Sequence, residues 1–512
     1  MPPSALRITP TAQELFDFRG DALILPLIEE GEPLRGPLKK IDEILLGAIA
    51  RTLRRKVFRG KPSERYLLHP STRLSVQQLL LIGLGKASEL TPDRIRQATA
   101  EALRQLLTLK SRRVAIALDH IDWGHLAGET IAQTITEGAL LGLHRFDSYK
   151  HEERGNGDRE VESLTLLCSD RETVRSLKRA IGRGETLARA TNLARDLINE
   201  PANVLTPTEL AARARDVARR YGLAAEVLDR DAMRRLGMGA LLGVAQGSAN
   251  PPRLIILRHR GGDDHAQPAL GLVGKGVTFD AGGISIKASE GMETMKGDMA
   301  GAAAVIGAMM GIAALRLPIH AVGVIPAVEN LPSGSAQRPG DIVRAMDGTT
   351  IEVINTDAEG RLILSDALCY TRRLGARRLV DVATLTGGVV VALGSVRTGF
   401  FSNDRTLAQQ VQGAGEATGE KLWELPLDDE YEELIKSDCA DLKNTGGGKK
   451  APAIGAARFL KHFVGDTPWV HLDINGTWLQ EKAQGYQPKG ATGVMVRTLI
   501  HLAATLASGR AR

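Results

Sequence analysis

Strand-like and helical segments alternate along the second half of the sequence, and this alternation is the strongest constraint on its fold. Strands are expected at residues 253–258, 269–274, 319–325, 351–354 and 378–384, and helices at 299–315 and 362–374. Strands that are separated by helices form parallel sheets, and the helices cover both faces. We therefore predict a mainly parallel central sheet flanked by helices, with ligands beyond the carboxyl ends of the strands.

The first part of the chain shows a similar alternation. Strand-like runs occupy residues 22–27, 78–83, 113–118 and 164–168, and helical periodicity covers 93–107. At 512 residues the chain is longer than one hydrophobic core usually serves. We predict an N-terminal α/β domain over residues 1–175, a linker helix over 176–195, and a larger C-terminal α/β domain over 196–512.

Composition indicates a soluble globular protein, with 43% apolar and 25% charged residues. Cys168, Cys369 and Cys439 are widely separated, which argues against a disulfide scaffold and favours a reducing, cytoplasmic location. The N-terminus lacks a charged region followed by an apolar one, so no secretory signal is expected. The apolar run at 299–315 approaches membrane-spanning length. Its many alanines and glycines and its place in mid-chain favour a helix buried in a core.

Two acidic residues lie close together between the expected strand at 351–354 and the expected helix at 362–374. If Asp357 and Glu359 alternate on the end of that strand, both carboxylates point the same way and repel each other. A nearby cation, either a basic side chain or a metal ion, is the usual remedy. A solvated turn with acidic caps is the alternative for this stretch taken alone. Gly360 allows a sharp turn, and Arg361 would lie in the first turn of the helix.

Further charged residues occur upstream at similar positions. Lys275, Asp280 and Lys287 follow the expected strand at 269–274, and Asp298 directly precedes an expected helix. Taken alone, Asp298 is a helix cap. Together, three aspartates and a glutamate exceed the negative charge that one pocket tolerates without divalent cations. Oxygen ligands with one amine suit Zn²⁺, Mn²⁺ or Mg²⁺, and two such ions about 3.5–4 Å apart would form a hydrolytic site. The chain has neither an H-E-x-x-H motif nor a G-x-S-x-G motif.

These residues lie in blocks that resemble the leucyl, or cytosol, aminopeptidase family of dinuclear metallopeptidases. The signature is NTDAEGRL at 355–362, and the supporting blocks are NEPANVLTP at 199–207, VGKGVTFDAGGISIK at 273–287, MKGDMAGAA at 295–303, RPGD at 338–341 and TLTG at 384–387. The resemblance covers the C-terminal part fully and the N-terminal part more loosely. It implies an aminopeptidase that acts on peptides, with a macro-like N-terminal α/β domain and a homohexameric assembly.

The resemblance also implies a set of metal ligands. Asp280 and Glu359 would bridge two divalent ions, which are Mn²⁺ or Zn²⁺. Lys275 and Asp298 would complete one ion's site, and Asp357 would complete the other. The free α-amine of the substrate would bind at the Lys275 side, which explains why only N-terminal residues are cleaved. A water that bridges the two ions would then attack the scissile carbonyl.

The remaining roles that the resemblance implies concern catalysis and substrate binding. Lys287 would stabilise the oxyanion, and Arg361 would hold a bicarbonate ion that accepts the proton. The backbone of Leu385 would position the substrate. Met295 and Thr384 would line the apolar pocket for the first side chain, and a leucine-like side chain is the family's preference.

Three positions depart from the family's usual pattern. Ala288 replaces a proline, and Gly297 replaces a bulky aromatic residue before Asp298. Both changes could loosen the loops that orient Lys287 and Asp298. Asn475 replaces an alanine beside the substrate pocket, so a polar side chain there puts the leucine preference in doubt.

Two alternative functions remain open. The chain has a net charge of +6, and Arg51-Thr-Leu-Arg-Arg-Lys-Val-Phe-Arg-Gly-Lys61 is a basic run that could bind DNA. More often such a run is a solvated helix face. A two-metal phosphohydrolase is the other alternative, and the lack of paired histidine ligands disfavours it.

Overall fold

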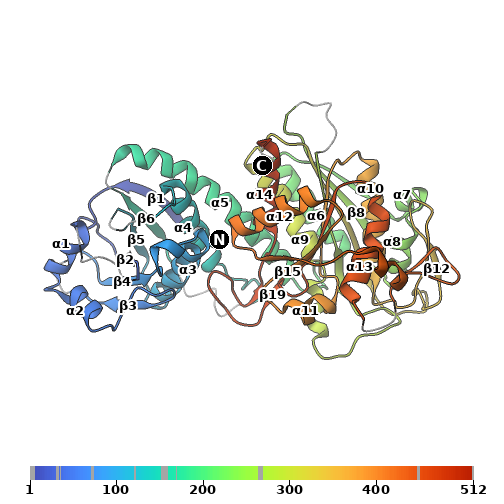
Figure 1. Ribbon diagram of the computed structural model, residues 1–512, viewed down its shortest axis with the longest axis horizontal. Helices are drawn as coiled ribbons and strands as arrows, with labels where there is room; N and C mark the ends of the chain where they lie inside the picture. The colour runs from blue at the N-terminus through green and yellow to red at the C-terminus, as the bar shows by residue number, and fades with distance from the viewer. Residues whose placement is uncertain are drawn as a thin grey trace. The chain divides into compact units, whose positions relative to one another are not determined.

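The chain divides into two compact units (Figure 1). The computed structural model describes residues 6–509 except 30–33, 35, 71–73, 120, 122, 151–159, 169, 263–268 and 447–449. The N-terminal unit extends to Arg189 and also includes Lys482–Pro488. The C-terminal unit contains Ala190–Glu481 and the residues from Lys489 onward. Helix α5, Arg171–Asn199, crosses the division and includes the segment expected as a linker helix.

The N-terminal unit is built on a sheet of six strands among its described residues. The order is β1 (Arg7–Ala12), β6 (Ser163–Cys168), β5 (Arg113–Ala117), β2 (Ala22–Leu27), β4 (Gln78–Gly83) and β3 (Arg65–Leu68). Neighbouring strands are parallel except for the antiparallel pair β3 and β4. Helices α1 (Gly36–Ile44) and α2 (Ala48–Arg54) share one apolar core with the sheet. A separate core joins the sheet to α3 (Pro92–Thr108), α4 (Gly128–Gly142) and the start of α5.

The central sheet of the C-terminal unit contains nine strands in the part of the chain that is described. The order is β16 (Leu422–Glu424), β15 (Thr398–Ser402), β18 (Trp469–Asp473), β14 (Leu379–Ala383), β9 (Leu270–Gly274), β11 (Ala321–Asn330), β8 (Arg253–His259) and β7 (Ala224–Leu228), with β10 (Gly276–Asp280) also paired to β11. The middle of this sheet, from β18 through β14 and β9 to β11, is parallel. This confirms the predicted α/β class.

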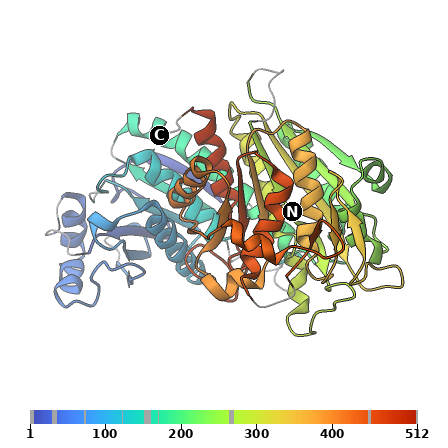
Figure 2. The same ribbon diagram turned by 45° about the vertical axis from the view of Figure 1, so that its right-hand side comes forward.

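Helices cover both faces of this sheet (Figures 1 and 2). On one face lie α6 (Pro207–Tyr221), α9 (Ala300–Ala314), α12 (Arg405–Thr418) and α14 (Val496–Ala507). On the other face lie α8 (Gly239–Val244), α10 (Glu359–Arg373) and α13 (Pro452–Val464). The unit also contains the short helices α7 (Arg230–Arg235) and α11 (Gly387–Leu393). Among the described residues of the chain, 3-10 turns include η1 (Ala87–Glu89), η4 (Ala245–Gly247), η5 (Met292–Gly297) and η6 (Asp429–Leu434).

The apolar run near residue 300 is the buried core helix that its composition predicts. Within the described residues, Met292–Ala314 is the one helical stretch long and apolar enough to cross a membrane, but 94% of its apolar 18-residue portion is buried. Every residue of α9 from Ala300 to Ala313 is buried, and the helix packs against β9, β11 and β14. A helix that is apolar on all sides is typical of the interior of a large domain.

One predicted strand differs in length and in place. The strand expected at 351–354 is β13, Thr350–Glu352, and it belongs to a small sheet with β12 (Ile342–Arg344) and β17 (Leu442–Lys443). It ends early because the side chain of Asn444 binds the chain that follows, accepting from the N–H of Ile354 at 2.8 Å. A second small sheet pairs β19 (Leu479–Gln480) with β20 (Gly490–Ala491).

Candidate metal centre

The carboxyl ends of the parallel strands meet at one edge of the central sheet and bring polar side chains together there. The residues at or directly after these ends are Lys275 after β9, Asp280 of β10, Asn330 of β11, Thr384 after β14 and Asp473 of β18. Each of these five side chains is buried. This edge is where an open parallel sheet binds its ligands, so the topology alone assigns the site.

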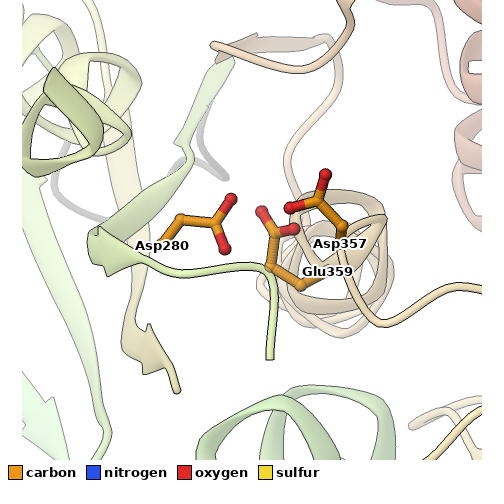
Figure 3. A group of neighbouring side chains, drawn as sticks. All are labelled: Asp280, Asp357 and Glu359. Atoms are coloured by element: carbon orange, nitrogen blue, oxygen red, sulfur yellow. The ribbon is translucent and has the colours of Figure 1, made fainter. Parts of the chain in front are cut away.

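Three carboxylates form the centre of this site. One oxygen from each of Asp280, Asp357 and Glu359 lies within 4.8 Å of the other two, which is a spacing that can hold a metal ion. Figure 3 shows the three side chains pointing toward a common space, with Asp280 opposite the other two. Glu359 is only 1% exposed and Asp280 only 2%. Such closely spaced buried carboxylates require a compensating cation.

The predicted strand end carrying Asp357 and Glu359 is wrong in detail. Asp357 lies in a turn, and Glu359 is the first residue of α10. The turn is stabilised by Asn355, whose side-chain oxygen accepts from the N–H of Asp357 at 2.8 Å. The amide of Asn444 also donates to the carbonyl of Asn355 at 2.7 Å. The carboxylates converge because a turn joins them, and not because they alternate along a strand.

One half of the site is deeply buried, and we call it the closed half: Lys275, Asp298 and Glu359. Lys275 Nζ lies 2.8 Å from Asp298 Oδ1 and 2.8 Å from Glu359 Oε1. Thr384 supports this half, since its carbonyl accepts from Lys275 at 2.9 Å and its hydroxyl donates to Asp298 Oδ1 at 2.7 Å. Gly360 has a different role from the predicted sharp turn. It lies inside α10, where a Cβ atom would come within 2.6 Å of the Lys275 side chain.

The other half is accessible to solvent, and we call it the open half: Lys287 and Asp357. Lys287 Nζ contacts Asp357 and lies 2.8 Å from Asp280 Oδ2. The side chains of Lys287 and Asp357 are 23% and 33% exposed, compared with 4% for Lys275. Asp280 is held between the halves, because its other oxygen accepts from Gly282 N and from the Asn330 amide, both at 2.9 Å.

The charges of the site fit divalent cations. Burial, followed by repulsion from Asp280, raises the pKa of Glu359 to about 8, and burial raises the pKa of Asp298 to about 6. Burial alone would lower the pKa of Lys275, but the attraction of Asp298, Glu359 and Asp280 outweighs it, so the net shift is upward. A group of acids that resists ionisation is a group that a divalent ion would stabilise in the charged form.

Three buried carboxylate atoms of the site also lack hydrogen-bond partners among the described residues. They are Asp298 Oδ2, Asp357 Oδ1 and Glu359 Oε1, although Lys287 contacts the second and the Lys275 ammonium lies 2.8 Å from the third. Buried oxygens of this kind are rare in folded proteins and indicate that an ion or water belongs beside them. The donor set of carboxylates with one amine therefore fits hard or borderline divalent ions such as Mn²⁺ and Zn²⁺.

Arg361 is buried in the first turn of α10, next to the acidic cluster. Its Nη1 donates to the carbonyl of Asn444 at 2.8 Å, and its Nε has no hydrogen-bond partner among the residues described. Burial lowers its pKa to about 10. A buried guanidinium with an unused donor near a helix N-terminus can hold a small anion.

The sequence reasoning missed Asp473, which organises the predicted substrate side of the site. Its Oδ1 accepts from the N–H groups of Leu385 and Asn475 at 3.1 and 3.2 Å, and its Oδ2 accepts from the Thr386 hydroxyl at 2.6 Å. The N–H of Leu385 is therefore engaged within the protein. The signal that could have identified Asp473 is its position as an acidic residue at the end of a strand.

Two other residues that were predicted to bind the substrate lie on segments next to the metal site. The side-chain amide of Asn475 donates to the carbonyl of Thr386 at 2.9 Å, so its polar group is directed to the Thr384–Thr386 segment. Met295 lies in η5, three residues before Asp298. The structure thus brings the predicted metal and catalytic residues together, and it places the predicted pocket residues on the segments that surround them.

The basic run at 51–61 begins in α2 and continues past its end. Its six arginine and lysine side chains are exposed, and Phe58 between them is buried in the core. The N–H groups of Arg59 and Lys61 are bound by the carboxylate of Glu64 at 2.7 and 3.2 Å. This arrangement is what a solvated surface segment requires.

Comparison with known protein families gives two matches. Residues 192–500 match the cytosol aminopeptidase family, catalytic domain, and residues 24–153 match the N-terminal domain of the same family. Proteins named "Probable cytosol aminopeptidase" align over nearly full length. The one from Solibacter usitatus is 48% identical over 97% of this chain and 99% of its own length, and the one from Alkaliphilus metalliredigens is 45% identical over 95% and 97%.

Solved structures agree with these matches. A variant of tomato leucine aminopeptidase has a TM-score of 0.88 and 33% identity, covering 98% of this chain and 97% of its own. The bottromycin maturation enzyme BotP in complex with manganese has a TM-score of 0.84 and 35% identity, covering 95% of this chain and all of its own.

These matches decide between the functions that the sequence leaves open. Neither the family descriptions nor the names of these relatives refer to nucleic acid, so DNA binding stays without support. A phosphohydrolase is not what the family model describes. Since both domains match and the relatives align along almost the whole chain, the protein belongs to the cytosol aminopeptidase family and is a metal-dependent aminopeptidase.

Proposed function

We propose that this aminopeptidase uses two divalent ions to hydrolyse the first peptide bond of peptides that have a free α-amine. The observation that carries the proposal is the group of Asp280, Asp357 and Glu359, whose oxygens approach within 4.8 Å between two lysines. A single ion needs fewer carboxylates than this site offers, because Asp298 is also present in the closed half.

The metal ligands divide between the two halves of the site. Lys275 and Asp298 would hold an ion in the closed half, and Asp357 would hold one in the open half, with Asp280 and Glu359 shared. Divalent ions in such a site supply Lewis-acid polarisation and a water of lowered pKa. The ions we propose are Mn²⁺ or Zn²⁺, and a manganese complex has been solved for the similar enzyme BotP.

Two basic residues serve the reaction directly. Lys287 is positioned by Asp280 and Asp357 at the solvent-accessible side, where its ammonium can donate to the oxygen of the scissile carbonyl as negative charge develops. Each nearby carboxylate already contacts a lysine or several N–H groups, which leaves none for a general base. Arg361 has an unused Nε donor, so we assign it a bicarbonate ion that takes the proton.

The predicted pocket for the first side chain is formed by Met295, Thr384 and the loop that includes Asn475, with the Leu385 carbonyl orienting the peptide. We propose that the pocket still prefers leucine-like side chains. The polar group of Asn475 donates to the Thr386 carbonyl at 2.9 Å, and this supports an apolar pocket despite the substitution.

The wider assignments rest on the family resemblance. We assign catalysis to the C-terminal unit, and we expect a homohexamer that works in the cytoplasm. The names of the relatives, which include the word cytosol, support the location.

The activity is tested by incubating metal-loaded protein with a short peptide and with the same peptide acetylated at its N-terminus. We expect release of the free first amino acid from the unmodified peptide alone. Leucyl, alanyl and glutamyl anilides then measure the side-chain preference. Cleavage of the acetylated peptide, or no cleavage of any free-amine substrate, would refute the proposal.

A further inference from the structure

The 3-10 turn η5 connects the predicted substrate pocket to the closed half of the metal site. It contains Met295, ends at Gly297, and leads directly into Asp298. The N–H of Asp298 donates to the carbonyl of Met295 at 3.3 Å, so the two side chains are displaced together if the turn moves. A short 3-10 turn has weak hydrogen-bond geometry of its own. Contacts from outside must therefore hold it in place.

A lysine in this turn is bound to the end of α5. Lys296 Nζ donates to the carbonyl of Asn199, the last residue of that helix, at 2.5 Å. A cation is favoured there because the last carbonyls of a helix are unpaired and carry partial negative charge. Asn199 opens the NEPANVLTP block, whose contribution is otherwise unexplained. The contact anchors one side of η5 to a 29-residue helix.

The other side of η5 is covered by an indole ring. A Cβ atom at Gly297 would lie 2.0 Å from Cζ3 and 2.3 Å from Cη2 of Trp478, so the ring occupies the space that any side chain at 297 would need. Trp478 is 9% exposed. The family pattern expects a bulky aromatic residue at position 297, and this chain supplies an aromatic ring from position 478 instead.

The two anchors of η5 are connected to each other. The carbonyl of Trp478 accepts from Thr492 N at 2.9 Å, and the N–H of the preceding residue, Ala491, donates to the side-chain oxygen of Asn199 at 3.2 Å. Asn199 thus holds Lys296 through its carbonyl and the Trp478 hairpin through its side chain. The contacts form a closed ring around η5.

We propose that Asn199, Lys296, Gly297 and Trp478 form a brace that positions Asp298 and the pocket wall at Met295. Lys296 is then a positioning residue, and Trp478 with Gly297 determines how well the first side chain of the substrate is discriminated. This inference rests on the proposed function, because it concerns the residues that fix the position of the closed half relative to the pocket for the first side chain. In this chain the Trp478 ring fills the space that a side chain at position 297 would need.

The first experiment tests Lys296. We expect Lys296→Met to weaken metal binding at the closed half by roughly 10–100-fold, which is the usual cost of losing a residue that orients a ligand. Lys296→Arg restores the contact and most of the affinity. Metal affinity is measured by competition with a coloured chelator, which does not depend on activity. Lys436→Met, at an exposed lysine paired with Glu433, is the matched control.

The second experiment tests the complementarity of Gly297 and Trp478 with a double-mutant cycle. Gly297→Phe forces two rings into one space, and Trp478→Ala leaves the turn uncovered, so each should lower the leucyl-to-alanyl ratio of kcat/KM by about tenfold. The double variant Gly297→Phe, Trp478→Ala puts one ring back and should recover most of the ratio. Trp478→Phe is the milder substitute where the alanine variant does not fold.

These outcomes separate the brace from the proposed function. A wild-type protein that cleaves no free-amine substrate would defeat the proposed function. Two results with an active wild type would defeat the brace alone. One is a Lys296→Met variant that keeps full metal affinity. The other is a double variant, Gly297→Phe with Trp478→Ala, whose loss of discrimination is the sum of the losses of the two single variants.

Discussion

The closed and open halves of the site have the same chemical parts but different surroundings. Each half joins a lysine to carboxylates at 2.8 Å, Lys275 to Asp298 and Lys287 to Asp280. The side chain of Lys275 is 4% exposed and that of Lys287 is 23% exposed. The closed half is enclosed by Thr384 and by Gly360 of α10, whereas the open half lies on the loop after β10 and on the turn before α10.

This difference indicates a division of labour. Charge in the closed half is poorly hydrated, so its residues are stable as ions only with one another or with a metal ion. Charge in the open half is reached by water, so a substrate can replace water there at lower cost. We therefore expect the closed half to hold its ion permanently and the open half to carry the step that changes charge.

The largest effect is expected from Glu359→Gln, because we propose that Glu359, like Asp280, is shared by the two ions. The change removes one negative charge from both ion sites, and we expect kcat/KM to fall by about 10³-fold or more, well beyond the 10–100-fold of an outer partner. Activity and bound metal are measured together. Glu290→Gln, at an exposed residue of the neighbouring loop, is the matched control. An active Glu359→Gln enzyme would remove this residue from the metal site.

Comparing Lys287→Met with Lys275→Met separates the roles of the two lysines. The open-half variant should keep its metal and lose roughly 10²–10³-fold in kcat, because a donor to the developing oxyanion is missing. The closed-half variant should lose metal first and be less stable, since it leaves buried carboxylates unpaired. Mass spectrometry of bound metal, kcat and the thermal midpoint distinguish the two. Equal loss of metal in both variants would contradict the division of labour.

Chelation should remove the two proposed ions in order. The open half is exposed to solvent, so its ion should dissociate about 10–100-fold faster than the ion held by Lys275 and Asp298. Bound metal per subunit is followed with time during dialysis against a chelator. Two phases are expected, and the first should abolish most activity. A single phase would mean that the halves are equivalent.

The smallest effect is expected at Thr384, which supports the closed half without binding the ion. Its hydroxyl donates to Asp298 Oδ1 at 2.7 Å. Thr384→Val keeps the shape and removes the donor, so metal affinity of the closed half should fall about tenfold, and Thr384→Ser should restore it. Competition with a chelator measures this. If Thr384→Val binds metal as tightly as wild type, the orientation of Asp298 depends on other contacts.

The fold was predictable because hydrophobic periodicity acts locally. The strands at residues 22–27 and 78–83 have the predicted bounds, and α9 begins and ends within one residue of the predicted helix. The end of β13 was not predictable, because the Asn444 side chain that terminates the strand lies 90 residues away along the chain. Side chains that bind a distant backbone leave no periodic signal.

The site was predictable to the extent that its residues fall in recognisable blocks. The acids and lysines of those blocks do converge, as the charge argument requires. The role of Asp473 was not predicted, because its own segment of the sequence does not show that it binds Leu385 and Thr386. The complementarity of Gly297 and Trp478 was not predicted for a related reason. A glycine in the sequence indicates only that space is needed at its position, and it does not identify the residue that fills this space.

The segment Lys482–Pro488 has a consequence for the order in which this protein is completed. It belongs to the N-terminal unit, where Tyr486 is buried beside Ala100 and Leu141 and its ring lies 5.5 Å from the Arg96 guanidinium. A ribosome therefore synthesises Ala190–Glu481 of the C-terminal unit before the first unit receives this segment. Although domains generally fold as units from the N-terminus, this unit is completed only after most of the C-terminal unit has been synthesised.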